Sequence, residues 1–268
     1  MQTKTKFLFF TILFFLSFIF LGHYFYTIDA THLNKDAILL PPSLEHLFGT
    51  DRLGRDMLAR IIEGGKISLI IGVGSALIAS FIGLVIGISA GYFKGKVDKS
   101  IMLSIDLFLT FPTFFLLLAM VSYVDASALV LIVVISITGW MGMARLIRSE
   151  AFSIGQKPFI KILKNAHVPL YKIVFKYYTP LLAPIFLISF TFGVSGAILA
   201  ESGLSFLGLG VMPPQMSWGS MLSEGKDLMD IAWWISFFPG FFIFLISLML
   251  IQLSDALQHQ FNQKEITQ

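Results

Sequence analysis

Long runs of apolar residues alternate along the chain with shorter polar segments. Six of these runs are long enough, at about 1.5 Å of helical rise per residue, to cross a hydrocarbon layer about 30 Å thick. Polar and apolar residues do not alternate within the runs, which excludes the strands of a transmembrane barrel. The pattern therefore predicts an all-α membrane protein with six transmembrane helices, at residues 7–27, 67–93, 100–124, 127–147, 178–200 and 231–254.

The composition supports this prediction. Hydrophobic residues make up 56% of the 268 residues and charged residues only 13%, whereas soluble domains are about half apolar and a quarter charged. A soluble domain is therefore excluded. Because the chain has no cysteine, a disulfide framework, a thiolate metal site and a cysteine nucleophile are excluded as well.

The first run follows Lys4 and Lys6, as a secretory signal would. Residues 24–27 offer no small-x-small cleavage site, however, and five further runs follow, so we expect an uncleaved first helix. With the N-terminus inside, 13 of the 19 basic residues fall on the cytoplasmic face, which predicts that both termini are cytoplasmic. These 13 are Lys4, Lys6, Lys94, Lys96, Lys99, Arg145, Arg148, Lys157, Lys161, Lys164, Lys172, Lys176 and Lys264.

Small residues recur at every fourth position of the second run. This spacing places them on one helix face, where another backbone can approach closely and make dispersion contacts. The face can pack within the chain or form a seam with another subunit, and the sequence leaves both alternatives open. The residues are Ser75, Ala79, Gly83, Gly87 and Gly91.

The inner segment 148–178 is basic and contains the signals of two short amphipathic helices. Apolar residues lie opposite Lys161 and Lys164, and Pro169 stands where a first-turn proline belongs, ahead of residues 171–178. We expect a protruding knob that binds a partner protein; a surface helix attracted to anionic lipid is the alternative. The apolar residues are Phe159, Ile160, Ile162, Leu163 and Ala166.

Two outer segments are also patterned. Residues 51–63 carry acids and bases at helical spacings suited to ion pairs, and Gly64 and Gly65 are expected to end that helix before the second span. In residues 201–230, glycines and the pair Pro213 and Pro214 preclude a continuous helix. Non-helical backbone at membrane depth is tolerated only where it is buried within the protein or lines a cavity. This segment is therefore expected to form part of a pore or gate. The candidate gate or path residues are Asp106, Pro112, Glu201, Pro213 and Pro214.

Three runs together resemble a known family. They are HLFGTDRLGRDMLARIIEGGKISLIIGV at 46–73, DLFLTFPTFFLL at 106–117 and ESGLSFLGLGVMPPQMSWGSML at 201–222. They resemble the permease subunits of ABC importers for dipeptides, oligopeptides and nickel, and are most similar to the dipeptide-permease C type. The resemblance covers nearly the whole chain in order. It implies a type I importer permease fold in the bacterial inner membrane, with residues 1–66 preceding a permease core of residues 67–268.

The resemblance also implies partners. They are a homologous second permease subunit, an extracytoplasmic substrate-binding protein and two ABC ATPase subunits, which would hold ATP and magnesium. This chain would bind no cofactor or nucleic acid and would catalyse no reaction itself. The knob at 148–178 would be the coupling loop that transmits ATPase motion to the spans. The function expected is uptake of dipeptides or oligopeptides, and nickel or a nickel chelate is the alternative cargo.

The sequence departs from the family in the coupling loop. Lys161, Ile162 and Leu163 stand where the family has Glu-Ala-Ala, and His167 stands at its glycine. If the glycine position needs a positive φ, a residue with a Cβ lowers the stability of the turn by about 1 kcal/mol or more, unless histidine tolerates this left-handed backbone. Lys161 reverses the charge of the family's glutamate, so a complementary acid is expected on the ATPase.

Two other classes of protein are disfavoured. A membrane enzyme needs a nucleophile and a base that face each other within the spans, and the sequence presents no such pair. The five histidines share no metal-ligand spacing, so a catalytic zinc is not expected. A passive channel would have no need of the basic knob.

Overall fold

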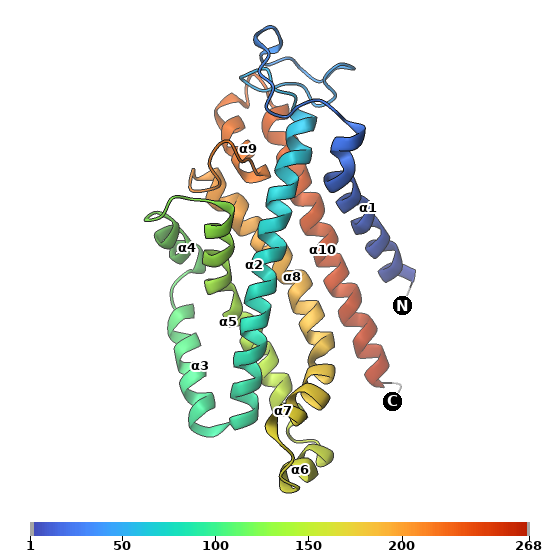
Figure 1. Ribbon diagram of the computed structural model, residues 1–268, viewed down its shortest axis with the longest axis vertical. Coiled ribbons are helices and arrows are strands. Elements are labelled where there is room, and N and C mark those ends of the chain that lie inside the picture. Colours follow the sequence, from blue (N-terminus) through green and yellow to red (C-terminus); the bar gives the residue numbers. More distant parts are fainter. Residues whose placement is uncertain (1–2, 267–268) are drawn as a thin grey trace.

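The computed structural model describes residues 3–266, and the side chains of residues 5–261. The side chains of Lys4 and Lys264, which entered the charge comparison, lie outside the described residues. The described chain is an elongated bundle of helices (Figure 1). Its long helices are α1 (Thr3–Phe25), α2 (Met57–Phe93), α5 (Ala128–Ile154), α8 (Thr179–Phe206) and α10 (Trp234–Ile266); its shorter ones are α3 (Gly95–Leu109), α4 (Thr113–Val121), α6 (Pro158–Asn165), α7 (Leu170–Ile173) and α9 (Trp218–Gly225).

Five of these helices, within residues 3–266, are long and apolar enough to cross a membrane, and the count becomes six if a bent pair forms one span. The bent pair is α3 and α4, which meet at an angle of 78°. The expectation of a single helix over residues 100–124 is therefore wrong. Pro112 lacks an amide hydrogen and disfavours helical backbone at the residue before it, which explains the break between Leu109 and Thr113.

α2 begins ten residues before the apolar run that predicted it. Asp56 caps it by accepting a hydrogen bond from the Ala59 amide at 2.9 Å, and the helix continues through Gly64 and Gly65. The expectation that these glycines end a helix is therefore wrong. A Cβ at Gly65 would lie 2.6 Å from Cζ2 of Trp218, so this glycine makes room for a buried indole. The domain boundary expected between residues 66 and 67 falls within this helix and stays a prediction.

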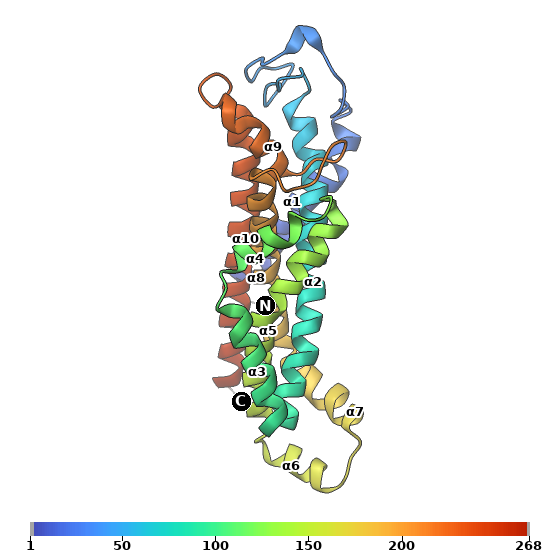
Figure 2. The same cartoon turned by 90° about the vertical axis from the view of Figure 1, so that its left-hand side faces the viewer.

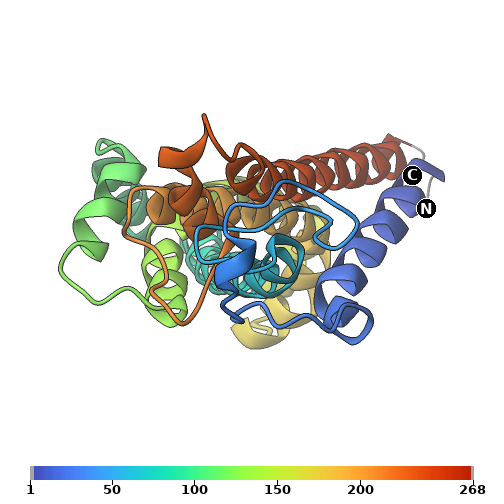
Figure 3. The same cartoon turned by 90° about the horizontal axis from the view of Figure 1, so that it is seen from above.

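The face of small residues on α2 lies against α5. A Cβ at Gly83 would lie 2.6 Å from Cγ of Met143, and one at Gly87 would lie 2.7 Å from the carbonyl oxygen of Ala144. A Cβ at Gly91 would similarly meet Ala151. The face could pack within the chain or against another subunit, and in the structure these three glycines pack within the chain, against α5. α2 occupies the centre of the bundle when viewed along its length (Figure 3).

The two ends of the bundle differ. At one end α6 and α7 project beyond the long helices (Figure 2). The opposite end carries α9 and the loop between α1 and α2 (Figure 1). We call these the α6 end and the α9 end. In Figure 1 the first residues of α1 and the last residues of α10 are the ends of these helices that face the α6 end, as expected for two termini on one face.

Candidate functional site

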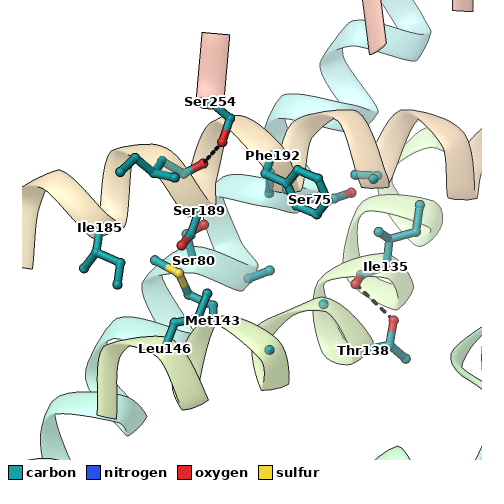
Figure 4. A pocket seen from close by; sticks show the side chains of 18 of the residues that line it. Ser75, Ser80, Ile135, Thr138, Met143, Leu146, Ile185, Ser189, Phe192 and Ser254 are labelled. Atoms are coloured by element: carbon teal, nitrogen blue, oxygen red, sulfur yellow. Dashed lines mark hydrogen bonds between the residues drawn. The ribbon is translucent and has the colours of Figure 1, made fainter. Parts of the chain in front are cut away.

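A cavity of about 940 Å³ runs beside α8 and is lined by side chains of α2, α4, α5, α8 and α10. Hydroxyl groups supply much of its polarity, including those of Ser75, Ser80, Thr138, Ser189 and Ser254 (Figure 4). The Ser254 hydroxyl donates to the carbonyl of Ile188 at 3.1 Å. The cavity is mostly apolar, and its hydrogen-bonding groups are neutral apart from the carboxylates of Glu150 and Asp255. Such a lining suits a solute whose polar groups must be partly desolvated.

The five candidate gate residues do not line this cavity. Asp106 forms an ion pair with Arg145 of α5, so this carboxylate has a partner outside the cavity. Pro112 stands at the break before α4. Pro213 and Pro214 lie in the exposed loop before α9, and Pro214 borders a smaller cavity beside the end of α1. The structure therefore does not bring these residues together as one site.

Glu201 is the exception with a clear structural role. Its side chain is fully buried near the α9 end of α8. Its Oε1 accepts hydrogen bonds from the hydroxyls of Ser205 and Ser217, both at 2.6 Å, and its Oε2 accepts one from Ser68 at 3.3 Å. The carboxyl group thus links α2, α8 and the start of α9, because it accepts hydrogen bonds from all three. A buried polar group is tolerated when it is hydrogen-bonded in this way.

A second polar cluster lies at the α9 end. Arg60 is 1% exposed and donates to both Asp51 and Glu224. Arg55 also bonds Asp51, through Nε at 2.6 Å, and Glu224, through Nη2 at 3.2 Å. The expectation that these ion pairs form within one helix over residues 51–63 is wrong, because residues 51–55 form a loop. One of the acids, Glu224, comes from α9.

Asp56, which caps α2, is held by two more side chains of the segment between α1 and α2. Tyr26 donates its hydroxyl hydrogen to Oδ2 of Asp56 at 3.0 Å, and Nδ1 of His46 lies 2.8 Å from the same oxygen. Burial, together with the neighbouring carboxylate, raises the pKa of Tyr26 well above its usual range. The phenol therefore stays protonated and remains a donor.

At the other end, α6 is anchored by a single buried face. Ile160 is fully buried and packs with Ile154, Ile173 and Tyr178. Lys164 places its Nζ 3.7 Å from the ring centroid of Tyr92 on α2, a cation–π contact. Burial, and secondarily the charge of Lys94, lowers the pKa of Lys164. The short helix is thus tied to the ends of α2 and α5.

The opposite face of α6 is open. Ile162 is 66% exposed and Phe159 is 40% exposed, and Lys161 between them is exposed as well. Leu163 is half-buried against the cluster around Ile160. An exposed apolar pair beside a lysine is typical of a surface that a protein partner covers.

The turn after α6 takes the form anticipated for the glycine position. His167 has a φ of +53°, its amide donates to the Lys164 carbonyl at 3.0 Å, and the amide of Val168 donates to the Leu163 carbonyl at 3.1 Å. This pair of bonds is a Schellman cap, in which the left-handed residue is usually glycine. Pro169 then precedes α7, which continues through a π-helical turn at residues 174–178 into α8, so the second helix of the knob is not separate as expected.

Two parts of the site were not found from the sequence. Arg60 and Glu224 are 164 residues apart, and Glu201 is expected from the sequence only as a gate or path candidate, without its serine partners. The signal for Glu201 was the group of serines around it in the sequence, at 202, 205 and 217. No spacing rule relates Glu224 to residues of α2, so that contact needed the three-dimensional structure.

Comparisons with known proteins agree with this architecture. Residues 83–266 match the family described as binding-protein-dependent transport system inner membrane component. The chain is 34% identical over 226 residues to the oligopeptide transport system permease protein OppC of Haemophilus influenzae, covering 84% of this chain and 73% of that protein. It is 37% identical over 226 residues to the dipeptide transport system permease protein DppC of Bacillus subtilis, covering 84% of this chain and 71% of that protein.

A solved structure shows the same fold. One chain of the MetNI methionine ABC transporter, in an inward-facing conformation, superposes with a TM-score of 0.59 at 15% identity, covering 75% of this chain and 97% of that chain. The bundle is therefore the membrane subunit fold of a type I ABC importer. The chain belongs to the family of binding-protein-dependent transport system inner membrane components, the permeases of the bacterial inner membrane. Membership implies ATPase and substrate-binding partners.

Proposed function

We propose that this chain is one of two permease subunits of an ABC importer that takes up dipeptides or oligopeptides. The relatives described above support this proposal, since their names are those of peptide permeases and they match over most of both chains. A homologous second permease would complete the path, and a substrate-binding protein would deliver cargo at the α9 end. The cavity of about 940 Å³ is then this chain's half of the path.

ATP hydrolysis belongs to the partners in this proposal. Two ATPase subunits would bind ATP and magnesium, and one of them would bind the α6 surface of this chain. The observation that carries this assignment is the structure of α6, with its buried face held by Ile160 and its exposed face formed by Phe159, Lys161 and Ile162. A rigid, anchored helix can transmit motion to α2 and α5, which a free surface helix cannot.

Charge reversal tests the coupling assignment. The double variant K161E/K164E should lower ATPase association and ATP-driven peptide uptake, because Lys161 lies on the exposed face of α6 and Lys164 holds α6 to Tyr92 of α2. Membrane insertion should be unchanged. The matched control is K96E/K99E, which changes the same charges on exposed residues of α3. Unchanged uptake in K161E/K164E would refute the assignment.

The choice of cargo needs its own measurement. Uptake of a labelled dipeptide and of nickel should be compared in a strain that lacks the chromosomal permease and carries this chain with its partners. Peptide uptake that depends on this chain is expected. No contact in the described structure favours nickel over peptide, and uptake of nickel without peptide would overturn the proposal.

A further inference from the structure

The charges that line the cavity are all of one sign. Among the described residues that line it there is no lysine, arginine or histidine, and its only ionisable side chains are Glu150 and Asp255. Glu150 lies one turn before the end of α5, and Asp255 lies on the part of α10 that leads to the C-terminus. Both carboxylates are therefore at the α6 end of the path, where most other charges of the protein are positive.

The neighbouring arginines do not neutralise these acids. Arg148 of α5 forms an ion pair with Asp98 of α3, with its Nε 2.7 Å from Oδ1. Arg145 of α5 forms an ion pair with Asp106, which also belongs to α3. Neither arginine lines the cavity. Within the described side chains, Glu150 and Asp255 have no ion-pair partner closer than 4.0 Å.

A neutral group lines the same cavity farther from the α6 end, where Ser75 is level with Ser136 of α5, about four helical turns before Glu150. The Ser75 side chain is 1% exposed, and its hydroxyl has no hydrogen-bond partner in the part of the chain that the structure describes. Ser75 belongs to the same cavity lining as Phe192 and Ile135 (Figure 4). A buried hydroxyl without a partner favours a ligand that can complete its hydrogen bonding, and a peptide bond offers both a donor and an acceptor.

We propose that Glu150 and Asp255 make the α6 end of the path selective for charge, so that it favours peptides of positive or zero net charge over peptides of negative net charge. This inference rests on the proposed peptide importer and adds a preference within its cargo. Two like charges beside a cavity with low-dielectric walls raise the local concentration of cations and oppose anions. The ammonium group of a peptide is a suitable partner for either carboxylate, because charge-assisted hydrogen bonds are strong.

The test uses the complete importer in proteoliposomes with three dipeptides, Ala-Lys, Ala-Ala and Ala-Glu. Each dipeptide is supplied at a concentration that saturates the binding protein, so that differences in initial rate report on later steps. For the double variant E150Q/D255N we expect the rate ratio of Ala-Lys to Ala-Glu to fall by at least about threefold. D255K should lower that ratio further, because it replaces a negative charge with a positive one.

A matched control distinguishes an effect of charges in the cavity from an effect of the total charge of the protein. Asp227 and Asp230 are exposed at the α9 end and do not line the cavity, so D227N/D230N should leave the ratio unchanged. An unchanged ratio in both E150Q/D255N and D255K would overturn the inference. An equal loss of uptake rate for all three dipeptides, together with weaker ATPase association, would also overturn it, because these acids would then be docking residues. If the unaltered importer takes up none of the three, the peptide proposal itself fails, and this inference fails with it.

Discussion

Arg60 holds Glu224 through two parallel hydrogen bonds, from Nη1 to Oε2 at 2.8 Å and from Nη2 to Oε1 at 3.0 Å. The arginine lies in the first turn of α2, and the glutamate lies near the end of α9. Arg60 also donates to Asp51, so one guanidinium group joins the loop before α2 to the helix that closes the α9 end. The relationship fixes α9 on the longest helix of the bundle.

Removing this guanidinium should destabilise the protein markedly. Arg60→Met would leave Asp51, which is 1% exposed, with only Arg55 as its ion-pair partner. Loss of one member of a buried ion pair costs about 3 kcal/mol or more. Thermal unfolding of the purified complex in nanodiscs measures this loss. Arg52→Met is the control, because Arg52 is exposed and bonds only a carbonyl oxygen of Glu224, and an equal loss in both variants would contradict the ranking.

Glu201 provides a second stability test. Glu201→Leu would leave the hydroxyls of Ser205 and Ser217 without their acceptor in a buried site. Each buried group left unsatisfied costs about 1–3 kcal/mol. Glu201→Gln keeps one acceptor oxygen and should lose clearly less. The two variants can be compared by resistance of the complex to heat and detergent, and equal stability of the leucine variant and the unaltered protein would contradict the role assigned to this carboxylate.

The packing of α2 on α5 depends on the absence of side chains at two positions. In the double variant G83A/G87A, each new Cβ would lie less than 3.0 Å from atoms of α5, so the helices must separate and the yield of intact complex should fall. Gly142 is the matched control, since a Cβ there would meet nothing within 4 Å. The yield after size-exclusion chromatography measures the effect, and normal recovery of G83A/G87A would show that these helices need no such close approach.

His167 should be replaceable by glycine with a gain in local stability. Its left-handed backbone costs histidine about 1 kcal/mol more than glycine, which has no Cβ. His167→Gly should therefore slow amide hydrogen exchange in α6, and His167→Val should accelerate it, because a β-branched side chain is poorly tolerated at this φ. Exchange in α9, far from the substitution, serves as the internal reference. Faster exchange in α6 of the glycine variant would contradict this account of the turn.

Much of the fold follows from local sequence signals. Apolar runs located the five continuous spans, and the small residues of α2 indicated a close helix contact, because both depend on spacing along one helix. The break at Pro112 does not follow from hydropathy, because the apolar run around it is long enough for one span and hydropathy gives the length of a run but not its direction. The continuation of α2 through Gly64 and Gly65 could not be predicted, because a glycine that ends a helix and one that makes room for a side chain such as Trp218 look the same in the sequence.

The candidate site divides in the same way. The knob and its left-handed turn at His167 followed from amphipathic spacing and from a family pattern, both local. The cavity lining combines residues of five helices, and the Arg60–Glu224 pair joins distant parts of the chain. Such contacts are set by tertiary packing, which a single sequence does not encode at any fixed spacing.

The central claim is that α6 transmits ATPase motion to the membrane helices, and cross-linking tests it most directly. Because the chain has no cysteine, Ile162→Cys places a single thiol on the exposed face of α6, and Leu44→Cys places one at the α9 end, where Leu44 is 97% exposed. A short bifunctional reagent applied to the assembled importer in inside-out vesicles should join position 162 to an ATPase subunit in a yield that changes with ATP. Position 44 should give no such product. Absence of an ATPase cross-link at position 162, with the thiol accessible to a maleimide, would contradict the account.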